Sequence, residues 1–169
     1  DPQNSDRLYI AAAKYDASAT LSVGGLFVSE DAGTSWSPTE LDGLPVNIVT
    51  TVVSDTKTVV FAGVGDYWLG SVTGGVYRSR TAGQTWEQIG LTDKVVNAIA
   101  IHPSNPDVIY AGTVHESSDS VEPRPVYKSF DGGNNWHQLD LVNCGNVEVI
   151  AIDPNDLNTL LVSSCSQIH

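Results

Sequence analysis

The sequence of 169 residues is short of positive charge, cysteine and methionine, and each shortage narrows what the protein can be. Only 8 Lys and Arg stand against 20 Asp and Glu, so the formal net charge is -12. Nucleic acids and anionic membrane surfaces are negative too, so a chain of this charge is repelled by both. No apolar run is long enough to cross a bilayer. We therefore predict no nucleic-acid partner and no direct membrane insertion.

Motifs for nucleotide, metal and nucleophilic chemistry are also missing. The sequence has no phosphate-binding loop, no Cys-x-x-Cys, no His-Glu-x-x-His and no Ser-His-Asp context. From these absences we expect the protein to bind neither a cofactor nor a metal. Methionine is absent even at position 1, which fits a processed or trimmed chain.

What the sequence does contain is a repeat with a period of 50 residues. The pattern Ser-x-Asp-x-Gly-x-x-Trp, which we call the box, occurs three times, and the third position of the middle copy is Thr. The members are Ser29, Asp31, Gly33 and Trp36, then Ser79, Thr81, Gly83 and Trp86, then Ser129, Asp131, Gly133 and Trp136. A period of this length is typical of blades or coils stacked along the chain.

The sequence pattern predicts four short strands in each unit, which we call a to d. In the third unit these are 95–101, 108–111, 126–129 and 136–139, and the box forms the turn from c to d. Breaker residues mark the turn from a to b, at 102–107 here and at 54–57 in the middle unit. Four-stranded units of this length predict an all-β fold, a β-propeller of antiparallel blades.

The units cover residues 1–45, 46–94, 95–145 and 146–169, and the first and last are incomplete. The sequence opens in the middle of an a-to-b hairpin and ends after a further a and b. This is slightly over three blades, whereas propellers typically close with four to eight. Two explanations are open. The chain is a piece of a longer propeller, which the sequence favours, or several copies assemble into one.

The box has a structural interpretation. An Asp at its third position can accept backbone N–H groups of its own turn, Gly allows positive φ, and Trp covers the hairpin. Burying one indole contributes at most about 4 to 5 kcal/mol. Thr81 in the middle box carries no charge. A metal or catalytic role for the boxes is therefore not expected.

The box resembles the Asp-box, or bacterial neuraminidase repeat, and the resemblance covers nearly the whole chain. Proteins with this repeat include sialidases, xyloglucan-cleaving glycoside hydrolases, sortilin-type receptors and a photosystem II assembly factor. The resemblance implies a fold far more than a function. In the hydrolases and receptors the boxes lie on the face opposite the functional one, so we expect function where the b-to-c loops lie.

Three long loops form that face, at 13–24, 63–74 and 113–125. The middle loop holds Asp66, Tyr67 and Trp68, whose aromatic rings could stack on sugars or anchor a protein, or fold back over a neighbouring blade. The third loop gathers His115, Glu116, Asp119 and Glu122 among serines. This cluster could hold a cation or act in acid–base chemistry, although a solvated loop is the favoured interpretation.

The two cysteines, Cys144 and Cys165, flank the last a–b hairpin. Cross-strand spacing would allow a disulfide there, and two free thiols are the alternative. A bridge would agree with a secreted, periplasmic or cell-surface location.

An enzyme is the second functional hypothesis. A sialidase would need an arginine cluster and a Tyr–Glu pair. The four arginines here are Arg7, Arg78, Arg80 and Arg124, and by this register Arg80 lies in the box turn on the wrong face. Sialidase activity is therefore not expected. A xyloglucanase-like hydrolase would need two carboxylates about 5 to 9.5 Å apart, for which Asp66 with Glu116 or Asp119 are candidates.

The prediction is therefore an incomplete, exported propeller that acts as a non-catalytic scaffold or binding module. Its partner would be a protein or a glycan on the b-to-c loop face, besides the remaining blades or further copies of the chain. The alternative is a fragment of a polysaccharide-degrading glycoside hydrolase.

Overall fold

A computed structural model of the chain describes residues 1–14, 23–66, 74–114, 126–139 and 146–165. In these ranges the chain forms 13 strands, all in antiparallel sheets, and no helix. No helix that could span a membrane occurs in the described part. The prediction of an all-β fold built from four-stranded antiparallel blades is confirmed.

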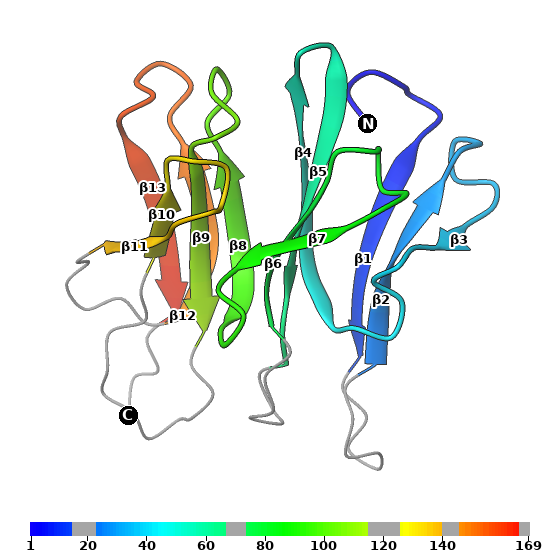
Figure 1. The fold of residues 1–169 in the computed structure, drawn as a ribbon, viewed down its shortest axis with the longest axis horizontal. Coiled ribbons are helices and arrows are strands. Elements are labelled where there is room, and N and C mark those ends of the chain that lie inside the picture. The colour runs from blue at the N-terminus through cyan, green and yellow to red at the C-terminus, as the bar shows by residue number, and fades with distance from the viewer. Residues whose placement is uncertain (15–22, 67–73, 115–125, 140–145, 166–169) are drawn as a thin grey trace.

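The strands form four sheets that follow one another in chain order (Figure 1). Sheet 1 is β1-β2-β3, sheet 2 is β4-β5-β6-β7, sheet 3 is β8-β9-β10-β11 and sheet 4 is β12-β13. Their bounds are β1 Leu8–Lys14, β2 Val23–Ser29, β3 Ser37–Pro38, β4 Val46–Ser54, β5 Lys57–Val64, β6 Gly75–Ser79, β7 Glu87–Gly90, β8 Val95–Ile101, β9 Ile109–Val114, β10 Val126–Ser129, β11 His137–Leu139, β12 Asn146–Ile152 and β13 Leu160–Cys165.

In the third unit, β8 and β10 have the expected limits, and β11 begins one residue later than the expected 136. The larger difference is at β9, because the sequence predicts a strand over 108–111 and β9 begins at Ile109 and runs to Val114. The extension arises because Thr113 and Val114 pair with Val96 and Val95 of β8.

The first serine of each box pairs with an equivalent position on the second strand of its sheet. Leu8 pairs with Ser29, and in the same way Val60 pairs with Ser79 and Ile109 with Ser129. These serines are almost fully buried. Leu8, Val60 and Ile109 are therefore equivalent positions in three successive sheets.

The a-to-b turn of sheet 2 is tighter than that of sheet 3. Asp55 and Thr56 connect β4 to β5 with φ values of 48° and 68°. Two successive residues with positive φ are typical of a type I′ hairpin, whose twist matches the twist of the flanking strands.

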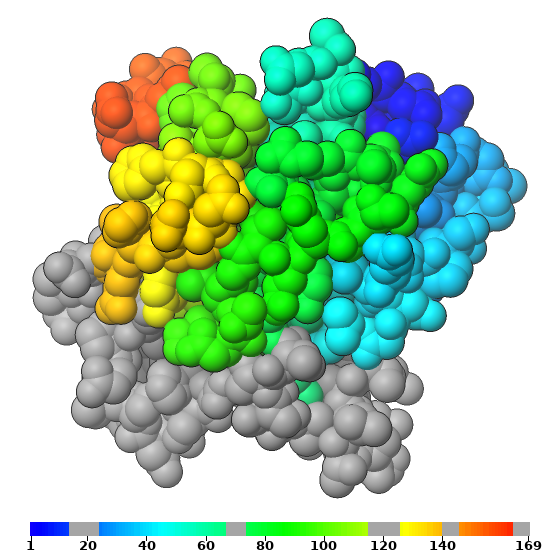
Figure 2. Space-filling model, in the orientation of Figure 1, coloured from blue at the N-terminus to red at the C-terminus, as the bar shows by residue number. Residues whose placement is uncertain are grey.

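The apolar core lies between neighbouring sheets. Leu26, Ala62 and Val64 form a cluster between sheets 1 and 2, and Phe61 and Ile99 belong to a second between sheets 2 and 3. A third cluster fills the space between sheets 3 and 4. Figure 2 shows the sheets packed side by side, from blue and cyan on the right through green to yellow and red on the left.

The box tryptophans extend this packing. Trp86 lies against the cluster between sheets 1 and 2, and Trp136 against the cluster between sheets 2 and 3. The indole Nε1 of Trp136 also donates to the Ile89 carbonyl oxygen in sheet 2, at 2.9 Å. Trp36 occupies the same position in sheet 1, but no described sheet lies on that side, and it is 37% exposed.

We expect replacing Trp136 by Ala to lower the free energy of unfolding by about 3 kcal/mol, because it removes apolar contact and a bond between sheets. Trp36→Ala is the matched control, and we expect a loss of at most about 1 kcal/mol since that indole is partly in solvent. Urea unfolding followed by circular dichroism measures both. Equal losses for the two variants would contradict the inter-sheet role of Trp136.

Candidate functional site

The blades present two edges, which the chain uses differently. The a-to-b turns and the boxes lie on one edge, which we call the box edge. The a-to-b turns are at the top of Figure 1. The second strand of each blade ends, and the third begins, at the opposite edge, which we call the loop edge. The loop edge is where the sequence predicts ligand binding.

The first box is a closed hydrogen-bonded unit on the box edge. Ser29 Oγ donates to Asp31 Oδ1 at 2.8 Å and accepts the Gly33 N–H at 2.8 Å. Asp31 also accepts the N–H and the hydroxyl of Ser35, at 2.8 and 2.6 Å. All of these bonds lie within one turn.

The third box repeats this network almost bond for bond. Ser129 donates to Asp131 Oδ1 and accepts the Gly133 N–H, both at 2.8 Å. Asn135 replaces Ser35 as the donor, through its backbone N–H at 2.9 Å and its side-chain amide at 2.6 Å.

The middle box makes the same turn without a carboxylate. Ser79 Oγ accepts the Gly83 N–H at 2.8 Å, and Thr81 Oγ1 accepts the Thr85 N–H at 2.9 Å. Ala82 and Gly83 have φ values of 53° and 90°, close to those of the corresponding residues of the first box. A hydroxyl at the third position is therefore sufficient to form the turn.

The network determines the charge state of the two box aspartates. Hydrogen bonds lower the pKa of Asp31 to about 2, with the Ser35 side chain as the main cause, and lower that of Asp131 to about 2, mainly through Asn135. Each carboxylate stays ionised at neutral pH and has its oxygens occupied by its own turn. These groups anchor the turns.

The loop edge is only partly described. Asp66 lies two residues after the end of β5 and is half-buried. The other predicted ligand-face residues lie outside the described ranges: Tyr67, Trp68, His115, Glu116 and Asp119. Cys144 lies outside them too, whereas Cys165 ends β13 and its backbone pairs with Asn146. The proposed disulfide thus remains a prediction.

Three polar side chains form a row along the loop edge. This row was not predicted from the sequence. Asn47, Asn97 and Glu148 lie at pairing irregularities near the start of β4, β8 and β12, which are the first strands of sheets 2, 3 and 4. Asn47 Nδ2 donates to the Gly65 carbonyl at 2.9 Å and to the Val96 carbonyl at 3.2 Å. Asn97 Nδ2 donates to Glu148 Oε2 at 3.0 Å.

The signal for this row was present in the sequence. Asn47 and Asn97 are 50 residues apart, and each follows a valine within the first two residues of the first strand of its sheet. The row links sheets 2, 3 and 4 immediately beside Gly65 and Asp66, so it gives the start of the middle loop a fixed position.

The far end of the middle loop is fixed as well. Gln88 Nε2 donates to the Gly74 carbonyl at 2.8 Å. A Cβ at Gly74 would lie 2.0 Å from the Lys94 carbonyl oxygen, so only glycine fits there. Next to it the Lys94 ammonium binds Asp93 at 2.8 Å and lowers the pKa of that carboxyl. Both ends of the loop therefore start from rigid positions.

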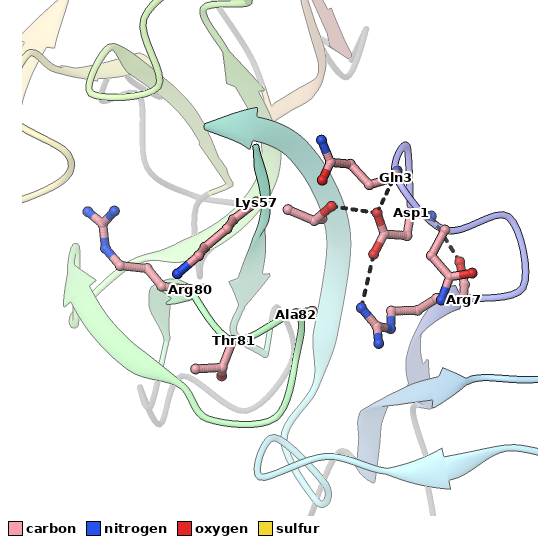
Figure 3. Close-up of a pocket in the computed structure, with 9 residues that line it drawn as sticks. Asp1, Gln3, Arg7, Lys57, Arg80, Thr81 and Ala82 are labelled. Carbon is pink, nitrogen blue, oxygen red and sulfur yellow. Dashed lines mark hydrogen bonds and ion pairs between the residues drawn. The ribbon is translucent and has the colours of Figure 1, made fainter. Parts of the chain in front are cut away.

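A hollow of about 370 Å³ lies between sheets 1 and 2 on the box edge (Figure 3). Arg7 and Lys57 line it, but Arg7 is bound to Glu30 at 2.9 Å and to Asp1 at 3.3 Å. Among the described residues no group of three His, Cys, Asp or Glu could hold a metal ion.

Comparison with known proteins agrees with the fold. No protein-family model and no curated protein matches the chain. The GH74 xyloglucanase from Xanthomonas campestris has a TM-score of 0.65 at 22% identity, over 94% of this chain and 24% of that one. The GH74 enzyme of Niastella koreensis gives 0.67 at 17% identity, over 97% and 34%. An ancestral GH74 enzyme gives 0.64 at 20% identity, over 95% and 22%.

At these identities the likeness shows the fold alone, and the chain is an arrangement of β-propeller blades. It spans between 22% and 34% of the length of these structures. The resemblance of the boxes to the Asp-box repeat stays a resemblance.

The box carboxylates predict how stability depends on pH. The folded pKa of about 2 for Asp31 and Asp131 lies below the ordinary value of 3.8. Their contribution is therefore fully present above pH 3.8 and is lost as the pH falls through 2. We expect Asp31→Thr with Asp131→Thr to reduce the fall in urea midpoint between pH 5 and pH 2, because Thr81 already makes this turn without a charge.

Thr81→Asp is the reciprocal variant, and it should enlarge the same fall by adding a third titrating carboxylate. A pH dependence that is unchanged in both variants would show that the boxes are not where the chain is acid-sensitive.

Proposed function

We propose that the chain is an exported, non-catalytic propeller scaffold whose loop edge binds a protein or glycan partner. The observation that carries this proposal is the division of the blades into two edges. On the box edge, the oxygens of Asp31 and Asp131 accept hydrogen bonds from their own turns. The second strand of each blade ends, and the third begins, at the opposite edge, so the long connections leave the sheets there.

The architecture supports binding at the loop edge. The rigid parts are the sheets, the closed boxes and the polar row from Asn47 to Glu148. The long connections that vary between units leave the sheets at the loop edge. Variable loops on a rigid scaffold are where proteins usually carry their binding residues.

The net charge of -12 bears on the kind of partner. A negative field favours a protein with a basic surface over an acidic one, and it does not oppose a neutral glycan. Tyr67 and Trp68 supply the amphipathic rings that either partner would contact.

A polysaccharide-degrading glycoside hydrolase is the second candidate. It is favoured by the fold shared with GH74 enzymes, one of them a xyloglucanase, and by the position of Asp66 on the loop edge. Glu116 or Asp119 would be its second carboxylate. Because the chain spans at most 34% of the length of those structures, the activity of a whole protein stays a proposal.

Replacing Asp66 by Asn together with Glu116 by Gln separates the two candidates. For a scaffold we expect xyloglucan retardation in affinity electrophoresis to be the same for the wild type and this variant, and no reducing ends to be released by either. Asp55→Asn with Asp156→Asn removes the same charge from the box edge and is the control. Loss of reducing-end release with retained retardation, in the Asp66 variant alone, would establish the hydrolase.

Export predicts a disulfide between Cys144 and Cys165. The intact mass of the chain purified from its native host should be about 2 Da below the reduced mass, and iodoacetamide should add nothing before reduction. Two alkylated cysteines in the unreduced chain would remove this support for export.

A further inference from the structure

A second hollow lies on the box edge, between sheets 2 and 3. Its volume is about 310 Å³, at the lower end of the range for sites that hold a small ligand. The a-to-b turns of both sheets line it, and these turns are neighbours at the top of Figure 1. Both sheets have four strands, so the hollow lies between two complete blades. Four charged side chains line it: Asp55, Arg78, Arg80 and Asp107.

Arg78 is a buried charge in this hollow. Its side chain is 9% exposed, and a guanidinium so far from water needs partners for its N–H groups. Nε donates to Glu87 Oε1 at 2.8 Å, and Nη1 donates to the Gly132 carbonyl oxygen at 2.5 Å. Among the described residues Nη2 has no acceptor. The arginine is particular to this sheet, since the residues 50 positions away are Val28 and Lys128.

The other three charges of the hollow are exposed and have few partners in the described part of the chain. The Arg80 side chain is 56% exposed, and its ion pair there is a loose one with Glu87, at 3.8 Å. The carboxylates of Asp55 and Asp107 accept no hydrogen bond from a described residue. Opposite charges therefore line one hollow, and within the described ranges no ion pair joins an arginine of the hollow to an aspartate of the hollow.

Gly132 in the third box leaves room for two of these charges. A Cβ at this position would lie 2.9 Å from Arg78 Nη1 and 3.0 Å from Asp107 Oδ1. The other two boxes carry Ala32 and Ala82 here, with φ values of 55° and 53°, so the turn itself accepts alanine. Glycine is therefore explained by the close approach of the guanidinium and the carboxylate and not by the turn.

The balance of charge limits what this hollow can hold. Its two arginines and two aspartates cancel, and the chain as a whole carries a net charge of -12. A simple anion would be repelled by the aspartates and by the field of the chain, and a simple cation would be repelled by the arginines. A ligand with one charge of each sign can pair with both sets.

We propose that this hollow binds a zwitterionic group, a carboxylate next to an ammonium. The carboxylate binds the guanidinium groups of Arg78 and Arg80, whose planar N–H donors match carboxylate oxygens. The ammonium binds Asp55 and Asp107. Such a group comes from a free amino acid, or from neighbouring acidic and basic side chains of a partner polypeptide. The site is on the box edge, so it does not depend on what the loop edge binds.

Glycine and the blocked peptide acetyl-Gly-Lys-Glu-Gly-amide are the probes for these two sources. A nuclear magnetic resonance titration of the 169-residue chain at fixed ionic strength follows Arg78 Nε and the Gly132 amide. We expect saturable shifts with at least one probe, with a dissociation constant of about 1 to 10 mM. Binding of glycine alone identifies a free amino acid as the source, and binding of the peptide alone identifies side chains of a polypeptide.

Acetate and methylammonium each carry one half of the group. We expect each of them to bind more than about threefold more weakly than the better zwitterionic probe, because one pair of charges in the hollow stays unpaired. This comparison separates a zwitterion site from a site for an adventitious ion.

Two variants test the roles of the exposed charges, because Arg78 is buried and its replacement could unfold the chain. Arg80→Gln and Asp55→Asn should each weaken the zwitterionic probe by about threefold and leave the urea midpoint unchanged. Acetate should bind more weakly to Arg80→Gln and more tightly to Asp55→Asn, and methylammonium should show the opposite order. Lys57→Gln and Asp6→Asn remove the same charges elsewhere on the box edge and are the matched controls.

The proposal is wrong if neither zwitterionic probe shifts Arg78 Nε or Gly132 in a chain that circular dichroism shows to be folded. Acetate that binds as tightly as the zwitterionic probes would also overturn it, because the hollow would then hold an adventitious ion only. Equal weakening by the control variants would contradict it too, since the effect would then come from the field of the whole chain.

Discussion

The packing of each sheet against the next is the constraint on which the rest of this structure depends. A four-stranded blade has two apolar faces and cannot bury either of them by itself. Phe61 and Ile109 show the result, since both are almost fully buried in a cluster that neither sheet could form alone. Where the described chain offers no neighbour, the large apolar residues of the outer sheets are exposed, including Ile10, Val149 and Leu161.

The boxes hold one edge of the packed sheets in a fixed geometry. A closed set of short hydrogen bonds holds each turn, and the third box also reaches into sheet 2 through Trp136 and through the Arg78 guanidinium, which donates to the Gly132 carbonyl at 2.5 Å. Buried Arg78 is held in turn by Glu87 at 2.8 Å. With one edge used for structure, the opposite edge is left for loops that differ from unit to unit, and this division supports the binding role that we propose.

The 50-residue period predicted the fold class, the third strands and the box turns, because those features depend on local residues in a fixed order. It did not predict the register of the second strands. Leu8, Val60 and Ile109 are equivalent but are not spaced by 50, since they lie 21, 19 and 20 residues before the box serines with which they pair, Ser29, Ser79 and Ser129. It also did not predict the polar row that begins at Asn47, because that contact joins residues of different sheets. Long-range contacts of this kind are not encoded in the local pattern.

Amide hydrogen exchange of the folded chain tests the interdependence of the sheets most directly. The account predicts the slowest exchange in β5 and β9, which are paired on both edges and covered by sheets on both faces, and much faster exchange in β1 and β13, which are not. The amides of Gly83 and Gly133, bound to the box serines, should follow the slow group. Equal protection of β1 and β9 would contradict the account, because it would mean that a sheet of this protein is stable without a neighbour on each side.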